Sequence, residues 1–158
     1  MTFRTQQEEK HMKFQRATDY AIRILCYLHE HDNHLSTAAS LSEKLGISYL
    51  YFMKVTGYLK QAGLLKSVQG CNGGYQLAKR AEDISLYDVV KVIEGEIMIN
   101  RCLEHDGYCS RGATDYCLVH KFFKSFQQEM IDELKSKRIP DLCETTKITS
   151  SQAAMTIV

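Results

Sequence analysis

The sequence has no long hydrophobic run and none of the short motifs that mark the common enzyme classes. No stretch approaches the roughly 18 consecutive apolar residues that a transmembrane helix needs, so we expect no membrane partner. The first residues, MTFRTQQEEKHMKFQR, have no apolar core of a secretory signal, and we therefore expect a cytoplasmic protein. The chain also lacks a P-loop, a G-x-G-x-x-G after a predicted strand and a recognisable Ser/His/Asp arrangement, which argues against an enzyme.

Cysteine is scarce and unevenly placed. The chain has six cysteines, and three of them fall within residues 102–120, CLEHDGYCSRGATDYCLVH. Thiols stay reduced in the cytoplasm, so clustered cysteines there indicate metal or redox chemistry rather than structural disulfides.

Charge is also unevenly spread, although the net charge is only +1. Residues 12–80 hold nine Lys and Arg against four Asp and Glu, whereas residues 81–158 hold nine against thirteen. A basic first half and an acidic second half indicate two tasks on one chain, and the basic half is compatible with nucleic-acid binding if a motif supports it.

The first half has the pattern of a winged helix-turn-helix. Apolar residues at steps of three and four from Phe14 to Leu28 predict an amphipathic helix. A second helix over 37–45, capped by Ser36 and ended by Gly46, precedes a third over 48–62, capped by Ser48. The extended runs 64–68 and 75–79 flank QGCNGG and predict a β-hairpin, the wing that follows such a helix pair.

The second half predicts a loop followed by a long helix. Ser85 and Asp88 form a capping-box pattern that opens a short helix. A helix over 114–138 follows the cysteine-containing loop, and Pro140 bars its continuation. Its apolar stripe has little else to pack against, so we expect pairing with the same helix of a second copy, with packing against the chain's own first helix as an alternative or an addition. The stripe consists of Val119, Phe122, Phe126, Met130 and Leu134.

The expected fold class is mainly α with a small β-hairpin: a winged helix-turn-helix domain plus a long C-terminal dimerisation helix. We divide the chain into residues 1–11, a disordered extension; 12–83, the DNA-binding domain; 84–143, the cysteine loop and dimerisation helix; and 144–158, a flexible tail.

Several of these segments together resemble the family of the iron–sulfur regulator IscR and the nitric-oxide sensor NsrR. The resemblance rests on FQRATDYAIRILCYL, LSEKLGIS, VTGYLKQAGLLKSVQGCNGGYQLAK, ISLYDVVKVIEG and the three-cysteine loop, in that order. It implies a homodimeric transcription factor, usually a repressor, that binds a palindromic operator in double-stranded DNA. Many members of that family carry an iron–sulfur cluster on three cysteines of this loop.

The loop has the spacing C-x6-C-x7-C-x2-H. The resemblance implies a [4Fe–4S] or [2Fe–2S] cluster on Cys102, Cys109 and Cys117, with His120 in the IscR-like position and Asp19 in the NsrR-like position as candidates for the fourth ligand. Such a cluster could sense nitric oxide, redox state or iron–sulfur status. Zinc in a Cys3His site, a thiol switch, and a cluster-free regulator acting through a partner like CymR stay open as alternatives.

In a winged helix, the N-terminal part of the third helix enters the major groove and the wing contacts the DNA backbone or the minor groove. We therefore expect Ser48, Tyr49, Tyr51 and Lys54 to contact DNA from the third helix, Lys66, Gln69 and Asn72 from the wing, and Lys13 and Arg16 from the start of the first helix.

Overall fold

The structure of the protein is a computed structural model, which describes residues 13–31, 34–70 and 73–143. Asn72, residues 1–11 and residues 144–158, for which predictions were made above, lie outside the described residues. The elements in chain order are α1 (Arg16–Glu30), α2 (Ala38–Leu45), α3 (Tyr49–Gln61), β1 (Leu65–Val68), β2 (Gly74–Leu77), η1 (Ala81–Asp83), α4 (Leu86–Glu94), η2 (Arg101–Leu103), α5 (Leu118–Ser136) and α6 (Ile139–Leu142).

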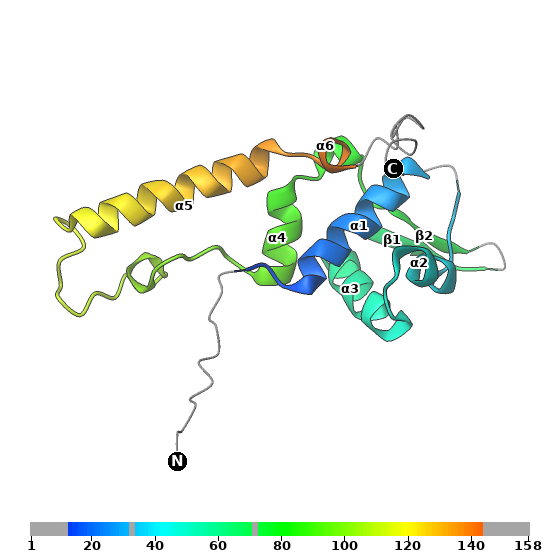
Figure 1. Cartoon of the computed structure of the whole chain (residues 1–158), viewed down its shortest axis with the longest axis horizontal. Helices are drawn as coiled ribbons and strands as arrows, with labels where there is room; N and C mark the ends of the chain where they lie inside the picture. The colour runs from blue at the N-terminus through cyan, green and yellow to red at the C-terminus, as the bar shows by residue number, and fades with distance from the viewer. Residues whose placement is uncertain (1–12, 32–33, 71–72, 144–158) are drawn as a thin grey trace, which may run out of the picture.

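Helix α1 lies at the centre of the core. Its apolar residues recur every three or four positions, so one stripe of the helix is buried. Ala21, Ile24 and Leu25 are fully buried there, and α1 packs on α3, α4 and α6. Figure 1 shows α1 crossing the middle of the body, with the hairpin and α2 on one side and α4 on the other.

Helices α2 and α3 form the predicted helix-turn-helix. Gly46 ends α2 in the left-handed conformation, at φ 65°, where a side chain would be strained, and this sharp stop sends the chain into α3. The predicted cap of α2 was wrong by one residue: Thr37, not Ser36, is the N-cap, and its hydroxyl accepts the Ser40 N–H at 3.3 Å. Ser36 instead pairs through its backbone with Tyr75 of the wing.

The wing is an antiparallel hairpin in which Leu65 pairs with Leu77 and Val68 with Gly74. Ser36 forms an isolated bridge to β2, since its carbonyl accepts the Tyr75 N–H at 3.0 Å. A Cβ on Gly74 would lie only 2.7–2.9 Å from the Ser36 backbone, so glycine is required for this approach. The segment before α2 therefore holds the start of β2, at the turn end of the wing.

In the second half of the chain, the predicted short helix is confirmed, and the predicted long helix is present with a later start. The capping box of Ser85 and Asp88 is present at the start of α4. Helix α5 begins at Leu118 rather than near residue 114, because residues 113–116 form a turn and Cys117 is the N-cap. It ends at Ser136, and Pro140 lies in the first turn of α6, where its missing N–H costs no helical hydrogen bond.

Helix α6 returns the chain to the core. The Ile139 N–H donates to the Ile84 carbonyl at 3.1 Å, and the Leu86 N–H donates to the Lys137 carbonyl at 2.8 Å. The Ile139 side chain is fully buried. One cluster of buried side chains thus includes residues from both sides of the domain boundary that was predicted after residue 83. The boundary itself stays a prediction.

Residues 95–136 form an arm that extends away from this body. In Figure 1, the loop leaves the body from the end of α4 and α5 returns above it to α6, and both lie far from α2, α3 and the hairpin. The Ile99 N–H donates to the Gln127 side chain at 3.0 Å, which fastens the loop along α5. The expected fold class, mainly α with a small hairpin, is confirmed. Within the described ranges, no helix is both long enough and apolar enough to cross a membrane.

Candidate DNA-binding surface and metal centre

Three of the four side chains that were expected to contact DNA from the third helix are exposed on α3 or at its N-cap. Ser48, Tyr49 and Lys54 are exposed at or near the start of the helix. Tyr51 is only half-buried, because its ring packs edge-on against Tyr20 at a centroid distance of 5.6 Å. Tyr51 therefore contributes to the packing of α3 on α1, and only its outer edge remains accessible.

Two apolar residues on the same face were missed by sequence reasoning. Leu50 is 82% exposed and Met53 is 37% exposed, next to Tyr49 and Lys54. The buried residues of α3 are Phe52, Val55, Thr56 and Leu59. That period already places Leu50 and Met53 on the outer face, where their methyl groups could contact thymine methyl groups in a major groove.

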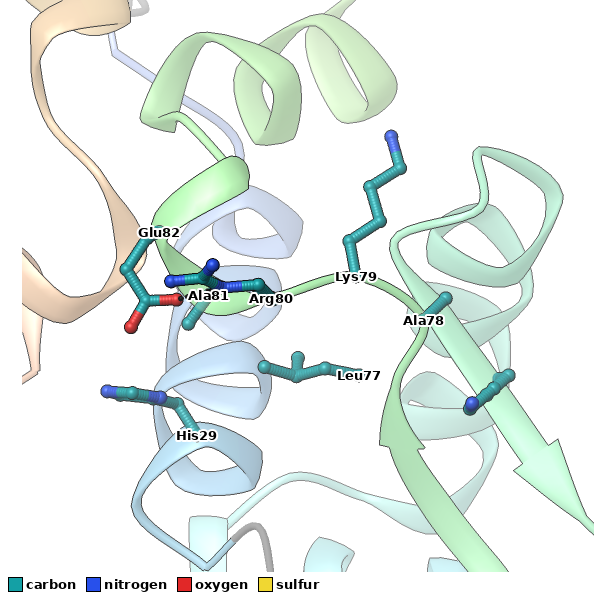
Figure 2. A pocket seen from close by; sticks show the side chains of 8 residues that line it. His29, Leu77, Ala78, Lys79, Arg80, Ala81 and Glu82 are labelled. Atoms are coloured by element: carbon teal, nitrogen blue, oxygen red, sulfur yellow. Dashed lines mark ion pairs between the residues drawn. The ribbon is translucent and has the colours of Figure 1, made fainter.

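The wing presents Lys66 and Gln69 as exposed side chains. At its base lies a surface hollow of about 590 Å³, lined by His29, Lys66, Leu77, Ala78, Lys79, Arg80, Ala81 and Glu82. Figure 2 shows Arg80 beside Glu82, with Lys79 pointing away from that pair. Arg80 and Glu82 are 3.5 Å apart, so part of this positive charge is locally neutralised, whereas Lys66 and Lys79 extend the basic surface of the wing.

The start of α1 places Lys13 and Arg16 on the surface and is fastened to the end of α4. The Glu94 carboxylate accepts the Gln15 N–H at 2.6 Å, the Gln15 side-chain amide at 3.1 Å and the Thr18 hydroxyl at 2.5 Å. A carboxylate at a helix N-terminus satisfies free N–H groups and favours the helix dipole. Glu94 is the last residue of α4, so the arm begins at the point where α1 is held.

Within the loop, Cys102 and His120 come together. The His120 Nδ1 lies 3.3 Å from the Cys102 Sγ, although the residues are 18 positions apart. Cys102 lies in η2 and His120 in the first turn of α5, and both are half-buried. The arm therefore folds so that one thiol and one imidazole share a site.

The surroundings of Cys109 favour its thiolate. Backbone N–H groups of Ala113 and Arg111 lower the pKa of Cys109, as does the nearby charge of the Arg111 guanidinium. Metals and iron–sulfur clusters are bound by thiolates, so this environment suits a ligand. The turn before it is held by Arg101, which forms a bidentate pair with Asp106 and lowers the pKa of that carboxyl to about 2.

The thiol and imidazole donors of the loop fit an iron–sulfur cluster, and the structure places one thiol beside the imidazole. Cys102 and His120 are adjacent, but no group of three or more His, Cys, Asp or Glu in the described parts of the chain has metal-binding geometry. Cys109 and Cys117 would have to move toward the first pair to join one site. Asp19 is half-exposed on α1 and pairs with Arg23, whose guanidinium lies 2.9 Å away.

Comparison with known proteins identifies the family. A family model described as "Iron-dependent Transcriptional regulator", Rrf2, matches residues 14–145. The chain belongs to the Rrf2 family. Its members are transcriptional regulators and not enzymes, and this Rrf2 chain is therefore a DNA-binding transcriptional regulator with a winged helix.

Among curated Rrf2 relatives, "Protein aau3" of Rhizobium meliloti is 32% identical over 134 residues, 80% of this chain and 87% of that protein. The "HTH-type transcriptional regulator NsrR" of Shouchella clausii is 37% identical over 90 residues, which span 56% of this chain and 60% of the NsrR. The predicted resemblance to the family of IscR and NsrR is thus confirmed.

Solved structures show the same fold. "T. potens IscR" has a TM-score of 0.64 and 23% identity, covering 83% of this chain and 85% of its own. The global cysteine regulator CymR of B. subtilis has a TM-score of 0.66 and 24% identity, covering 84% of this chain and 97% of its own. Both comparisons support the fold alone.

Proposed function

We propose that this protein is a homodimeric transcriptional repressor whose binding to operator DNA is controlled by an iron–sulfur cluster on the cysteine loop. The observation that carries the proposal is the 3.3 Å approach of His120 Nδ1 to Cys102 Sγ, within an Rrf2 chain whose loop holds two further cysteines. Cys102, Cys109 and Cys117 are the proposed thiolate ligands, and His120 or Asp19 is the proposed fourth ligand.

The residues of the loop would tune such a site. A cluster with one nitrogen or oxygen ligand reacts with nitric oxide or oxidants more readily than one held by four thiolates, which suits a sensor. The backbone N–H groups around Cys109 keep that thiol available as thiolate.

Contacts of Glu94 connect the cysteine loop to the proposed DNA-binding surface. It is followed directly by the loop, and it accepts hydrogen bonds from Gln15 and Thr18 at the start of α1. That end of α1 also carries Lys13 and Arg16, two of the proposed phosphate contacts. A change in loop position would therefore shift these side chains, and a coupling of about 1–3 kcal/mol would change operator occupancy roughly 5- to 150-fold.

The dimer is proposed from the exposed apolar face of α5. Val119, Phe122 and Phe126 are 58%, 64% and 45% exposed, and the rings of the two phenylalanines are stacked. An unpartnered stripe of this kind on a protruding helix is covered by pairing with a second copy. Two-fold pairing would present two α3 helices to half-sites on one face of the DNA, which gives a palindromic operator.

A second candidate is a cluster-free regulator that responds through a thiol or a partner, or one that binds zinc. The cluster-free form of this candidate is supported because the four loop donors form no group of three with metal-binding geometry among the residues the structure describes. The lowered pKa of Cys109 would also make it a reactive thiol.

The deciding experiment is anaerobic purification followed by measurement of iron, acid-labile sulfide and visible absorption. The wild-type protein should contain iron and sulfide in stoichiometric amounts and bleach on addition of nitric oxide. A variant with Cys102, Cys109 and Cys117 replaced by Ser should contain neither, whereas the matched control Cys26→Ser should retain both. Wild-type protein that stays free of iron and sulfide after anaerobic reconstitution would favour the second candidate.

The fourth ligand can be assigned with a matched pair of variants. Asp19→Asn removes a candidate ligand and also breaks the ion pair with Arg23, whereas Arg23→Gln breaks the same ion pair and leaves the carboxylate. Faster cluster loss in Asp19→Asn than in Arg23→Gln would assign Asp19. Faster loss in His120→Ala, with both α1 variants behaving as wild type, would assign His120.

A further inference from the structure

Outside the loop, two cysteines approach one another at the junction of α1 and α6. The Cys143 Sγ lies 3.0 Å from the Ile139 carbonyl oxygen, and the Cys26 Sγ lies 3.9 Å from the same atom. The residues are 117 positions apart, and no predicted function in the cysteine loop uses either of them. Both thiols are half-buried.

The junction that holds them is well packed. Cys26 belongs to α1 and Cys143 follows α6, and these helices lie against one another. Ile139, whose carbonyl both thiols approach, is fully buried. The two thiols are thus held near one another by the packing of α6 on α1.

We propose that Cys26 and Cys143 form a reversible disulfide that fastens α6 to α1, independent of the cysteine loop. The chemical partner is a small-molecule disulfide of the glutathione class. The juxtaposition of two sulfur atoms around one carbonyl oxygen carries the proposal.

The reaction is two successive thiol–disulfide exchanges. Cys143 loses its proton to solvent, and its thiolate attacks one sulfur of the small disulfide, whose S–S bond breaks and releases one thiolate. Cys26 then loses its proton and attacks the Cys143 sulfur, which releases the second small thiolate. The two protein thiols are oxidised to one disulfide, and the small disulfide is reduced to two thiols.

The surroundings make this pair slow to react. Burial raises the pKa of Cys26, as does its hydrogen bond with Cys143, and burial also raises the pKa of Cys143. The nearby Glu30 carboxylate adds to both effects. Since the thiolate is the attacking species, the pair stays reduced under mild exposure and reacts under sustained oxidising conditions.

A disulfide here would fix the root of the arm. Helix α6 follows α5 directly, and α1 carries the proposed DNA contacts Lys13 and Arg16 near its start. The bond would close a long loop of chain and so restrict the unfolded state. We expect a higher midpoint of thermal unfolding in the oxidised protein than in the reduced protein.

The test uses the full chain with Cys71, Cys102, Cys109 and Cys117 replaced by Ser, so that only Cys26 and Cys143 remain. Incubation with oxidised glutathione at increasing times should remove both free thiols and yield a monomeric chain lighter by two hydrogen atoms, without bound glutathione. Dithiothreitol should restore both thiols. Far-UV circular dichroism before oxidation checks that the variant is folded.

Peptide mapping of the wild-type protein is the second measurement, and it does not depend on the variant. Trypsin cleaves after Arg23 and Lys44, which places Cys26 on residues 24–44, and after Arg138 and Lys147, which places Cys143 on residues 139–147. Under non-reducing conditions the two peptides should be found linked. In the control Cys26→Ser, Cys143 should instead carry glutathione.

Two outcomes overturn the proposal. One is a folded four-serine variant that accumulates glutathione on both cysteines or forms disulfide-linked dimers. The other is wild-type protein in which both peptides stay unlinked while the same treatment oxidises the loop cysteines. Neither outcome bears on iron content, so failure here is distinguishable from failure of the cluster proposal.

Discussion

The cysteine loop and the α1–α6 junction both hold cysteines, but they surround the thiols differently. In the loop, the Cys109 sulfur accepts hydrogen bonds from backbone N–H groups and lies near a guanidinium, and both lower the pKa of the thiol. In the junction, burial is the largest effect on Cys26 and Cys143 and raises the pKa of both. The same cysteine side chain thus behaves differently in the two regions. Beside backbone dipoles it is a ready metal ligand, and among buried apolar groups it reacts slowly.

The largest expected difference between these regions is in alkylation rate. In cluster-free, reduced protein near neutral pH, iodoacetamide should modify Cys109 faster than Cys26 by more than about a hundredfold, since the lowered pKa gives Cys109 the larger thiolate fraction. Mass spectrometry of tryptic peptides measures this in a Cys102→Ser background, because Cys102 and Cys109 share residues 102–111. Equal rates would remove the basis of the comparison.

The next effect concerns packing. Replacing Ile139 by Ala in the junction removes a fully buried side chain and should lower the free energy of unfolding by about 2–5 kcal/mol. Replacing Tyr108 by Ala in the loop removes a side chain that is 57% exposed and should change it by no more than about 0.5 kcal/mol. Urea denaturation of both variants measures the contrast, and a similar loss in the two would contradict it.

A smaller effect is expected where the two regions meet. Thr18 is buried and donates its hydroxyl to Glu94, so Thr18→Val should cost about 1.5–3 kcal/mol of unfolding free energy, the usual value for a hydrogen bond to a charged group. If this contact also couples the loop to α1, operator affinity should depend less on cluster loss in the variant. Lys91→Gln, three residues before Glu94 on α4 and exposed, is the control.

The smallest effect is expected from Asp106. Its pairing with Arg101 lowers the pKa of the carboxyl from 3.8 to about 2, so the ion pair stabilises the folded state above pH 3.8 and this contribution is lost as the pH falls toward 2. Both side chains are exposed, so solvent screens most of the interaction. Asp106→Asn should lower the thermal midpoint slightly near neutral pH and not at all near pH 2.

Local patterns in the sequence were enough to predict most of the body. The period of α1, the glycine at the end of α2 and the Ser85–Asp88 capping box each act within a few residues, so the sequence alone indicated them. The start of α5 was placed too early because Thr114, Asp115 and Tyr116 do not oppose a helix, and only the turn back to Ala113 excludes it.

Contacts between distant residues were beyond such patterns. Nothing near Glu94 in the sequence indicates that it caps α1, because its partners lie 76 and 79 positions away. The approach of Cys26 to Cys143 is of the same kind, since only the return of α6 to α1 brings together two residues 117 positions apart. For the cysteine loop, the family resemblance supplied the candidate donors, which stay a prediction, and the structure adds the approach of His120 to Cys102.

Helix α5 can also be considered as a lever. Its 19 residues span about 28 Å at 1.5 Å per residue, and its root is fixed where α6 packs on α1. A rotation of about 7° at that root moves the far end by about 3.4 Å, the rise of one base pair along a DNA strand. If the far end is held by a second copy, the same rotation displaces the body instead. Small angular adjustments at the α1–α6 junction thus become displacements of the size of a step along DNA.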